Sequence, residues 1–360
     1  MNFKREERFL LLTPEYIWGG AETQFRYFIA YAEKHKKKLD VIIEHRFKEE
    51  DPNLKKDAER MKTVRFFEMN EYDAYSEKFV KDIIIHILQN IFKVKYKACL
   101  IHYTPDLAVA PFLRLLGIKV IYSERNDASV LENNSYYRRC LKFCKGITAN
   151  SKYAQKALEA LTGRKVIFIR NGKPMLEPLE MKVSREIQNI LVPCRVFPVK
   201  NQMMVLQFIK ENKSFTGKAV FAGRIEDKTY FRKLLRFIEA NYLQDRVEFM
   251  GQVEDMKELY QSADLVVLPS LLEGTPNVVL EAYLYYRPVI VSDSKTVKGV
   301  VTDPGMRFSL RGTKGIDKCI NYIQSLSDEE YRLMLKKNRE YVLDKYNVEK
   351  MTESYFQLLG

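Results

Sequence analysis

The strongest constraint on the fold is an alternation between short apolar runs and longer stretches of mixed polar and apolar residues. The runs are rich in β-branched and aromatic residues, and charged or turn-forming residues bound each of them. They are Phe9–Thr13, Leu39–Ile43, Ala98–His102, Val120–Ser123, Gly146–Ala149 and Val166–Ile169, and then Ile190–Pro193, Lys218–Ala222, Arg246–Met250, Leu265–Leu268 and Val289–Ser292. This alternation predicts parallel βαβ units and an α/β class.

The domain organisation follows from the point at which the pattern restarts. A chain of 360 residues fits two domains of ordinary size. The stretch between the two series of runs contains two prolines and no apolar periodicity, which indicates a linker. We therefore expect two Rossmann-like, doubly wound domains at 1–172 and 187–345, joined by a linker at 173–186. In such folds ligands bind outside the carboxyl ends of the strands.

Composition narrows the class of protein. Hydrophobic residues make up 46% and charged residues 30%, which is typical of a globular chain rather than a disordered one. The five cysteines are scattered and lack C-x-x-C spacing, so we expect neither zinc nor disulfides and a reducing, cytoplasmic environment. The charged N-terminus lacks the apolar region of a secretion signal, and no apolar stretch reaches the roughly 18–20 residues that cross a bilayer.

The net charge of +13 is concentrated in one quarter of the chain. Residues 81–170 contain 16 Lys and Arg against 6 Asp and Glu. In the segment 136–143 aromatic and cationic residues alternate, as they do in interfacial helices. Two interpretations stay open at this stage: peripheral contact with anionic lipid on the inner face of the cell membrane, and a solvated basic face beside a buried aromatic stripe.

The segment 268–293 combines several features of a binding loop. Thr275 is a predicted helix N-cap with Pro276 at the first helical position. Glu273 lies just before this helix, and Glu281 lies eight residues further on. Backbone N–H groups at a helix start suit an oxygen-rich ligand, and carboxylates accept hydrogen bonds from sugar hydroxyls. Alone, two glutamates at this spacing indicate no more than a capped helix with two solvated side chains.

Two further segments have residues suited to phosphate. After the run Ile190–Pro193, Arg195 and Lys200 place two cations at the carboxyl end of a strand, where they can hold a diphosphate. By themselves these cations are equally typical of an ordinary basic loop. Near the N-terminus, Gly19 and Gly20 allow close approach of the backbone to a phosphate, although the segment lacks the G-x-G-x-x-G pattern of dinucleotide-binding proteins.

Taken together and in order, nine segments resemble the motifs of the retaining, nucleotide-sugar-dependent glycosyltransferases of family 4, of the bacterial polysaccharide type. They are WGGAE (18–22), YSERND (122–127), ITANS (147–151), IRNG (169–172), CRVFPVKN (194–201), VFAGR (220–224), DRVEFMGQV (245–253), ADLVVLPSLLEGTPNVVLEA (263–282) and RPVIVSD (287–293). The resemblance implies the GT-B fold, an α/β architecture of two Rossmann-like domains facing each other across a cleft. It further implies that the N-terminal domain binds the acceptor, that the C-terminal domain binds the nucleotide sugar, and that a final helix at about 346–360 crosses back to the first domain.

The resemblance also implies roles for single residues. Glu273 would face the donor sugar, and Glu281 would bind the ribose hydroxyls. Arg195 and Lys200 would neutralise the donor diphosphate and the leaving group, so that Glu273, Arg195 and Lys200 form the catalytic set. Further donor contacts are implied for Gly19, Gly20, Gln252, Val253, Gly274, Thr275, Pro276 and Asn277. Because the basic pair can replace a metal ion, we expect no metal and no cofactor besides the sugar-nucleotide substrate.

One departure from the family lies on the acceptor side. Where the family often has a histidine at the end of an N-terminal-domain strand, this chain has Arg125. Arginine stays protonated and cannot act as a base, but it can hold a phosphate or an acceptor. A front-face retaining mechanism needs no enzymic base, because the departing phosphate oxygen takes the proton. The acceptor-side candidates are His102, Glu124, Arg125 and Asn126.

The expected function is transfer of a hexose or N-acetylhexosamine to a glycan or lipid-linked acceptor during capsule, exopolysaccharide or lipopolysaccharide synthesis. The resemblance favours a UDP-sugar donor over GDP-mannose. The alternatives are a GT-B sugar-nucleotide epimerase, an inactive sugar-nucleotide-binding module and a basic nucleic-acid-binding protein. All four histidines lie before residue 103, which disfavours the epimerase, and nucleic-acid binding leaves the paired glutamates and cations unexplained, so we expect no nucleic-acid partner.

Overall fold

A computed structural model of the protein describes residues 5–13, 20–43, 52–69, 77–126, 128–253, 255–273, 275–294 and 297–360. The chain divides into two compact units, each with its own sheet. Unit 1 is Met1–Gly172 together with Val348–Gly360, and unit 2 is Lys173–Asn347. The border between the units thus falls after residue 172, where the sequence analysis ends its first domain.

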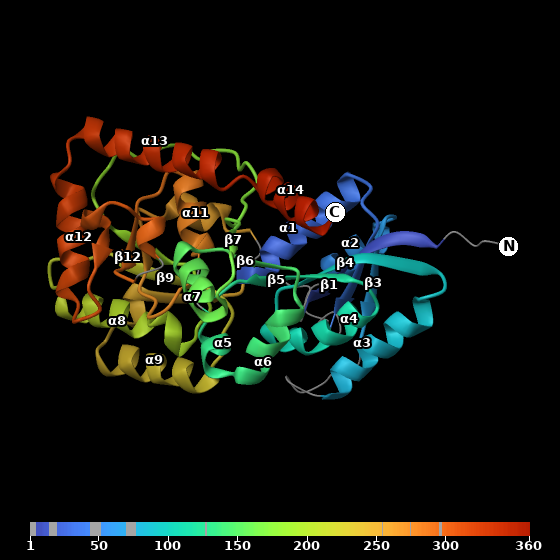
Figure 1. The fold of residues 1–360 in the computed structure, drawn as a ribbon. Helices are drawn as coiled ribbons and strands as arrows, with labels where there is room; N and C mark the ends of the chain where they lie inside the picture. The colour runs from blue at the N-terminus through green and yellow to red at the C-terminus, as the bar shows by residue number, and fades with distance from the viewer. Residues whose placement is uncertain are drawn as a thin grey trace. The chain divides into compact units, whose positions relative to one another are not determined.

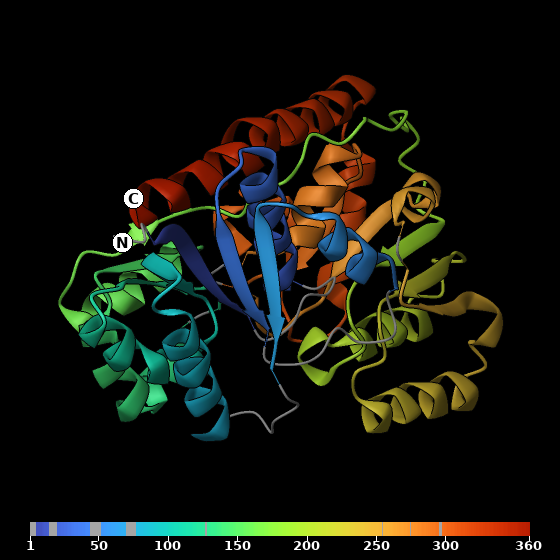
Figure 2. The same cartoon turned by 90° about the vertical axis from the view of Figure 1, so that its right-hand side faces the viewer.

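The sheet of unit 1 has seven strands in the order β3-β2-β1-β4-β5-β6-β7. All neighbouring strands are parallel, and β1, β2 and β3 lie side by side in blue in Figure 2. The strands are β1 (Glu6–Thr13), β2 (Leu39–Ile43), β3 (Val64–Glu68), β4 (Val94–Ile101), β5 (Lys119–Glu124), β6 (Gly146–Ala149) and β7 (Ile167–Phe168). The order runs outward in both directions from β1 and β4, as in a doubly wound sheet.

Helices cover both faces of this sheet (Figure 1), and the buried side chains form a separate core on each face. Leu10 and Leu12 of β1 belong to one core and Leu11 to the other, because successive side chains of a strand point to opposite faces. The helices are α1 (Gly20–Lys34), α2 (Pro52–Arg60), α3 (Glu77–Asn90), η1 (Thr104–Val109), α4 (Ala110–Leu115), α5 (Ser129–Asn133), α6 (Ser135–Cys140), η2 (Leu141–Phe143), α7 (Lys152–Thr162) and α14 (Val348–Leu359).

The C-terminal helix α14 belongs to unit 1 although it follows unit 2 in the chain. Its buried residues Met351, Tyr355 and Leu359 complete the core that contains Leu11. The aromatic ring of Phe356 also stacks on Phe28 of α1, with 4.5 Å between ring centroids. The end of the chain is therefore packed on the N-terminal sheet, as the resemblance implies.

The sheet of unit 2 has six parallel strands in the order β10-β9-β8-β11-β12-β13. They are β8 (Asn189–Val192), β9 (Lys218–Ala222), β10 (Val247–Gly251), β11 (Leu265–Leu268), β12 (Val289–Ser292) and β13 (Arg307–Phe308). The helices are η3 (Pro198–Lys200), α8 (Gln202–Glu211), α9 (Lys228–Ala240), η4 (Gln244–Arg246), α10 (Lys257–Ser262), α11 (Asn277–Leu284), η5 (Val297–Gly299), η6 (Pro304–Met306), α12 (Lys314–Ser325) and α13 (Asp328–Lys345). From β8 the chain continues to β9, the neighbour of β8 on one side, whereas β11 is its neighbour on the other side. The strand order therefore reverses between β8 and β11, which is the switch point of the sheet.

The segments that enter and leave unit 2 run side by side. The backbone N–H of Lys173 donates to the carbonyl of Tyr346 at 2.7 Å, and Lys173 pairs with Asn347 in an isolated parallel bridge. In unit 1, a Cβ added to Gly172 would lie 2.5 Å from Cα of Val348. Residues 174–186, most of the expected linker, contain no helix or strand, and they belong to unit 2 by their contacts.

Candidate functional site

The switch point of unit 2 brings a cation and a carboxylate together. The loops that follow β8 and β11 are joined by a backbone hydrogen bond of 2.8 Å from Leu271 to Val199. Next to it, Nζ of Lys200 donates to Oε1 of Glu273 at 2.6 Å. These side chains are 16% and 11% exposed, so the pair is largely shielded from solvent. Two residues of the expected catalytic set therefore meet at the edge of the sheet where ligands bind in this class of fold.

The second glutamate, Glu281, is held on α11 by two donors. The ammonium of Lys173 donates to Oε1, and the hydroxyl of Tyr260 donates to Oε2 at 3.1 Å. Burial first, and then the charge of Glu281, raises the pKa of Tyr260 well above its usual range, so the phenol remains a neutral donor. A carboxylate has about four lone-pair sites, and this arrangement leaves two for a ligand. The sequence analysis missed Lys173 and Tyr260, which lie 108 and 21 residues from Glu281 and belong to no motif.

Arg195, the other expected phosphate ligand, points elsewhere. Its guanidinium forms an ion pair with Glu226, with 2.9 Å between Nη1 and the carboxylate, and half of its side chain is exposed. Lys200 and Arg195 thus lie on the same loop but have different partners. The preceding Cys194 stands where the family often has glycine, and burial raises the pKa of its thiol to about 12.

Four of the remaining donor-side residues, Gln252, Val253, Pro276 and Asn277, follow strands at the same edge of the unit 2 sheet. Gln252 is exposed and Val253 is partly buried, and both follow β10, two strands away from β8. Helix α11 begins at Asn277 with Pro276 in the cap position, so the predicted N-cap at Thr275 is wrong by one residue. The reason is the extended backbone of Pro276, with ψ of 104°, which keeps this residue outside the helix. Gly19 and Gly274 lie outside the described residues, and Gly20 is the first residue of α1.

In unit 1 the expected acceptor residues lie at the carboxyl ends of β4 and β5. Arg125 is buried, and its guanidinium donates to the hydroxyl of Tyr355 at 3.1 Å and to Oδ1 of Asn171 at 2.5 Å. Glu124 is also buried and accepts backbone N–H groups from Arg125 and Asn126 at 3.0 and 2.9 Å. These contacts hold the turn after β5 and the C-terminal helix, while Asn126 is exposed.

His102 has an environment suited to accepting a hydrogen bond. Its ring stacks on Phe25 with 3.7 Å between centroids, and the residue is buried. Burial, and to a smaller degree the charge of Arg125, holds the pKa of His102 well below its usual range, so the imidazole is neutral. No described residue lies within hydrogen-bonding distance of its Nε2 atom. The sequence placed His102 at the end of the strand, but only the packing shows that it is neutral.

Comparison with known proteins identifies the family. Residues 184–342 match the family model described as "Glycosyl transferases group 1". The chain is also similar to the "N,N'-diacetylbacillosaminyl-diphospho-undecaprenol alpha-1,3-N-acetylgalactosaminyltransferase" of Campylobacter jejuni, at 31% identity over 282 residues, which make up 78% of this chain and 65% of that protein. Residues 184–342 thus match the group 1 glycosyltransferases, and the chain is similar to members that transfer sugars.

Other relatives and solved structures agree with this placement. The glycosyltransferase is 26% identical over 207 residues to the "GalNAc-alpha-(1->4)-GalNAc-alpha-(1->3)-diNAcBac-PP-undecaprenol alpha-1,4-N-acetyl-D-galactosaminyltransferase" of Campylobacter jejuni, covering 54% of this chain and 55% of that protein. The chain thus spans less than two thirds of the length of either relative. Its fold matches that of HepE from Anabaena, solved in complex with UDP and glucose, with a TM-score of 0.80, 17% identity, and coverage of 98% and 99% of the two chains. The glycosyltransferase therefore has the GT-B fold.

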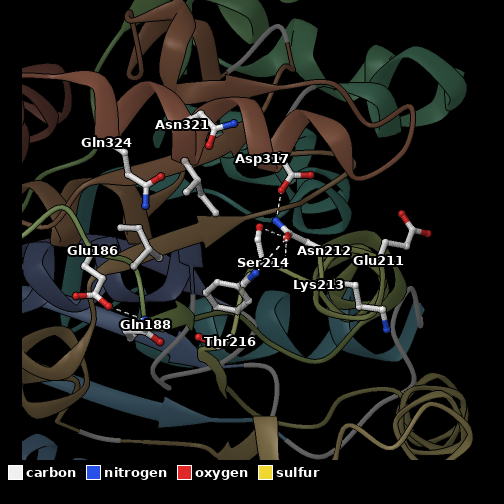
Figure 3. Close-up of a pocket in the computed structure, with 13 residues that line it drawn as sticks. Glu186, Gln188, Glu211, Asn212, Lys213, Ser214, Thr216, Asp317, Asn321 and Gln324 are labelled. Atoms are coloured by element: carbon white, nitrogen blue, oxygen red, sulfur yellow. Dashed lines mark hydrogen bonds between the residues drawn. The ribbon is translucent and has the colours of Figure 1, made fainter.

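A separate hollow of about 650 Å³ opens at the other edge of the unit 2 sheet of the glycosyltransferase (Figure 3). It is lined by residues that precede β8 and β9 and by α12, among them Gln188, Asn212 and Asp317. The amide of Asn212 donates to the carboxylate of Asp317, so part of this polar surface is already paired. None of the expected donor residues lines this hollow, and it lies at the amino ends of the strands, away from the switch point.

Within the described ranges, no group of three or more His, Cys, Asp or Glu side chains is arranged to hold a metal ion. In the part of the glycosyltransferase that the structure describes, no helix is both long and apolar enough to cross a bilayer.

Proposed function

We propose that the protein is a retaining glycosyltransferase that moves a hexose or N-acetylhexosamine from a UDP-sugar to a lipid-linked glycan. The observation on which this rests is the arrangement at the switch point of unit 2. There, the Lys200–Glu273 ion pair shares the carboxyl edge of the sheet with Glu281, which accepts hydrogen bonds from two donors. One cation and two carboxylates are thus placed along this edge. A diphosphate needs the cation, and the hydroxyls of a sugar and of a ribose need the carboxylates.

The chemistry assigned to these residues balances without an enzymic base. The bond between the sugar C1 and the leaving phosphate oxygen breaks, the bond from C1 to the acceptor oxygen forms on the same face, and the acceptor proton passes to the diphosphate. Lys200 donates to the diphosphate as its charge develops, and Arg195 joins it by exchanging Glu226 for phosphate. Glu273 then accepts a hydrogen bond from a sugar hydroxyl. Preorganised cations of this kind stabilise a leaving group as a metal ion does.

The relatives support the choice of donor and acceptor. The names of the two Campylobacter jejuni proteins state transfer of N-acetylgalactosamine to acceptors on diphospho-undecaprenol, and the HepE structure contains UDP and glucose. We accordingly favour a UDP-sugar over GDP-mannose, and a lipid-linked glycan in the assembly of capsule, exopolysaccharide or lipopolysaccharide.

The test is a panel of UDP-, GDP- and ADP-sugars, measured first by thermal shift and then by nucleotide release with undecaprenyl-diphosphate-linked acceptors. We expect stabilisation by a UDP-sugar, UDP release that depends on acceptor, and an α-linked product from an α-linked donor. A β-linked product would refute retention. Interconversion of the free sugar nucleotide with no new glycosidic bond would instead establish the epimerase alternative.

We also propose that unit 1 contacts anionic lipid through the amino edge of its sheet. Phe92, Leu115 and Phe143 are exposed apolar residues in the turns or short helices just before β4, β5 and β6, and 83%, 85% and 43% of their surfaces are open to solvent. These strands are neighbours and lie roughly 5 Å apart, so the three residues lie along one edge of the sheet, and we call them the apolar row. Cations occupy the same segments and the strand starts beside them: Lys93, Arg114, Lys119, Lys142 and Lys145.

The row differs from the interfacial helix that the sequence suggests. Helix α6 has only six residues, and its Tyr137 and Cys140 are buried while Tyr136 is about half exposed. The aromatic side chains of this segment are thus divided between core and surface. The apolar row with its cations is consequently the better candidate for lipid contact.

Co-sedimentation with vesicles tests the lipid contact. Wild type is expected to bind vesicles that contain anionic lipid at low salt and to be released at high salt, whereas Phe92→Asp and Leu115→Asp lose binding. Tyr242→Asp, which changes an 88% exposed aromatic residue of unit 2, is the matched control and should bind as wild type does. Binding that ignores lipid charge and salt would refute the proposal and leave the glycosyltransferase assignment intact.

A further inference from the structure

Lys173 is the first residue of unit 2 and has a side chain that points inward. The side chain is 3% exposed, and its ammonium donates to Oε1 of Glu281. Its backbone is fixed independently, because its N–H donates to Tyr346 and the residue pairs with Asn347 at the end of the same unit. Both the main chain and the charged group of Lys173 are therefore held by residues of unit 2.

The two protein donors on Glu281 determine how its carboxylate is presented. Lys173 occupies a site on Oε1 and Tyr260 a site on Oε2, so rotation of the carboxylate would break one of the two contacts. Both partners donate to Glu281, because a carboxylate can only accept, an ammonium has no lone pair, and the raised pKa keeps the phenol protonated. The side chain of Glu281 itself remains 28% exposed, so its carboxylate is still accessible to a ligand.

The ammonium also supplies the opposite charge that a part-buried carboxylate needs. A nearby opposite charge stabilises a carboxylate, and a hydroxyl donates more strongly to a carboxylate than to a carboxylic acid. In a part-buried site, Glu281 without this partner would have only the neutral Tyr260 to compensate its charge.

We propose that Lys173 is a positioning residue for the nucleotide: it holds the carboxylate of Glu281 in the orientation that meets the ribose hydroxyls. The inference rests on the proposed function, which assigns the ribose to Glu281. It adds a residue that no motif contains and that lies at the point where the chain enters unit 2. Lys173 acts through Glu281 and need not touch the nucleotide.

The experiment compares the affinities of UDP and 2′-deoxy-UDP, because their ratio reports the ribose contact alone. Wild type is expected to bind UDP about tenfold more tightly than 2′-deoxy-UDP, the effect of one hydrogen bond to a charged group. In Lys173→Met the ratio should fall below about threefold, and Lys173→Arg should restore part of it. Lys182→Met is the matched control: Lys182 pairs with Asp264 at 3.0 Å in the same unit, at the opposite edge of the sheet, so its ratio should equal that of wild type.

The outcomes separate the inference from the proposed function. A wild-type protein that binds no UDP, or binds both nucleotides equally, contradicts the assigned role of Glu281 and with it the inference. A wild-type preference for UDP that persists in Lys173→Met overturns the inference alone. If circular dichroism shows that Lys173→Met is unfolded, Lys173→Gln is measured in its place, and an unchanged ratio there has the same meaning.

Discussion

Removing the charge of Glu281 and removing that of Glu273 should have different effects on nucleotide binding. Glu281→Gln keeps the shape of the side chain but loses the carboxylate that we assign to the ribose. Two weakened hydrogen bonds correspond to about 1–3 kcal/mol, or roughly a 5- to 150-fold rise in Kd for UDP. Glutamine also leaves the buried ammonium of Lys173 without its carboxylate. Alanine would remove the remaining side-chain oxygen as well, so the rise in Kd for Glu281→Gln is a lower limit for Glu281→Ala.

Glu273→Gln should act in the other direction on free UDP. In the structure Glu273 accepts a hydrogen bond from Lys200 at 2.6 Å, so a diphosphate must compete with it for the ammonium. A largely shielded pair of this kind is worth about 1 kcal/mol after discounting for solvent screening. Without the carboxylate, UDP should bind equally well or up to about fivefold more tightly, while turnover falls because the contact with the sugar is lost.

The assay is isothermal titration of UDP into wild type and both variants, together with steady-state turnover. Glu248→Gln, an exposed glutamate on β10, is the matched control and should change neither quantity. An equal loss of UDP affinity in Glu281→Gln and Glu273→Gln would refute the separate roles of the two carboxylates.

Three further predictions concern the metal, a carboxylate and a glycine. Turnover should be unchanged in EDTA; loss with EDTA and recovery with magnesium would refute the metal-free mechanism. Partial burial raises the pKa of Glu33, but hydrogen bonds from Thr63 and neighbouring backbone N–H groups outweigh it and lower the pKa to about 2. Glu33→Gln should therefore lower the thermal unfolding midpoint at pH 7, by an amount that shrinks as the pH falls from about 5 toward 2. A difference in midpoint that does not change with pH would contradict this. Gly172→Ala places a Cβ 2.5 Å from Cα of Val348, so α14 should exchange its amide hydrogens faster, and unchanged exchange would show that the backbone adapts without cost.

The sequence predicts the strands that are buried on both faces, but it misses two strands at the edges of the sheets. Strand β2 is buried at all five positions, so it forms a continuous apolar run. Strand β3, Val64–Glu68, lies at the edge of the sheet and is mostly half-buried, and its Arg65 and Glu68 interrupt the apolar pattern. Strand β13 is only two residues long, too short to form a pattern of its own. Periodicity reports burial, so these two edge strands escape it, whereas the edge strands β7 and β10 overlap apolar runs that the sequence does show.

The same limit applies to the candidate site. Lys200 and Glu273 could be brought together from sequence because each follows a strand, and the carboxyl ends of parallel strands meet at one edge. Arg195 has a long, half-exposed side chain that can reach several partners, so no local pattern specifies its ion pair with Glu226. Lys173 meets Glu281 only because the end of unit 2 fixes the backbone at residue 173, which is a property of the whole fold.

The position of α14 determines the order in which the two units can fold on the ribosome. Unit 2 is an insertion between Gly172 and Val348, so all of its residues are synthesised before the core of unit 1 receives Met351, Tyr355 and Leu359. At roughly 5–20 residues per second, translation of unit 2 takes on the order of 10–40 s. During that interval Leu11 and its neighbours lack part of their cover, and the apolar face of the first sheet is open to chaperones. A helix that is made after unit 2 thus completes a core whose other residues are made before it.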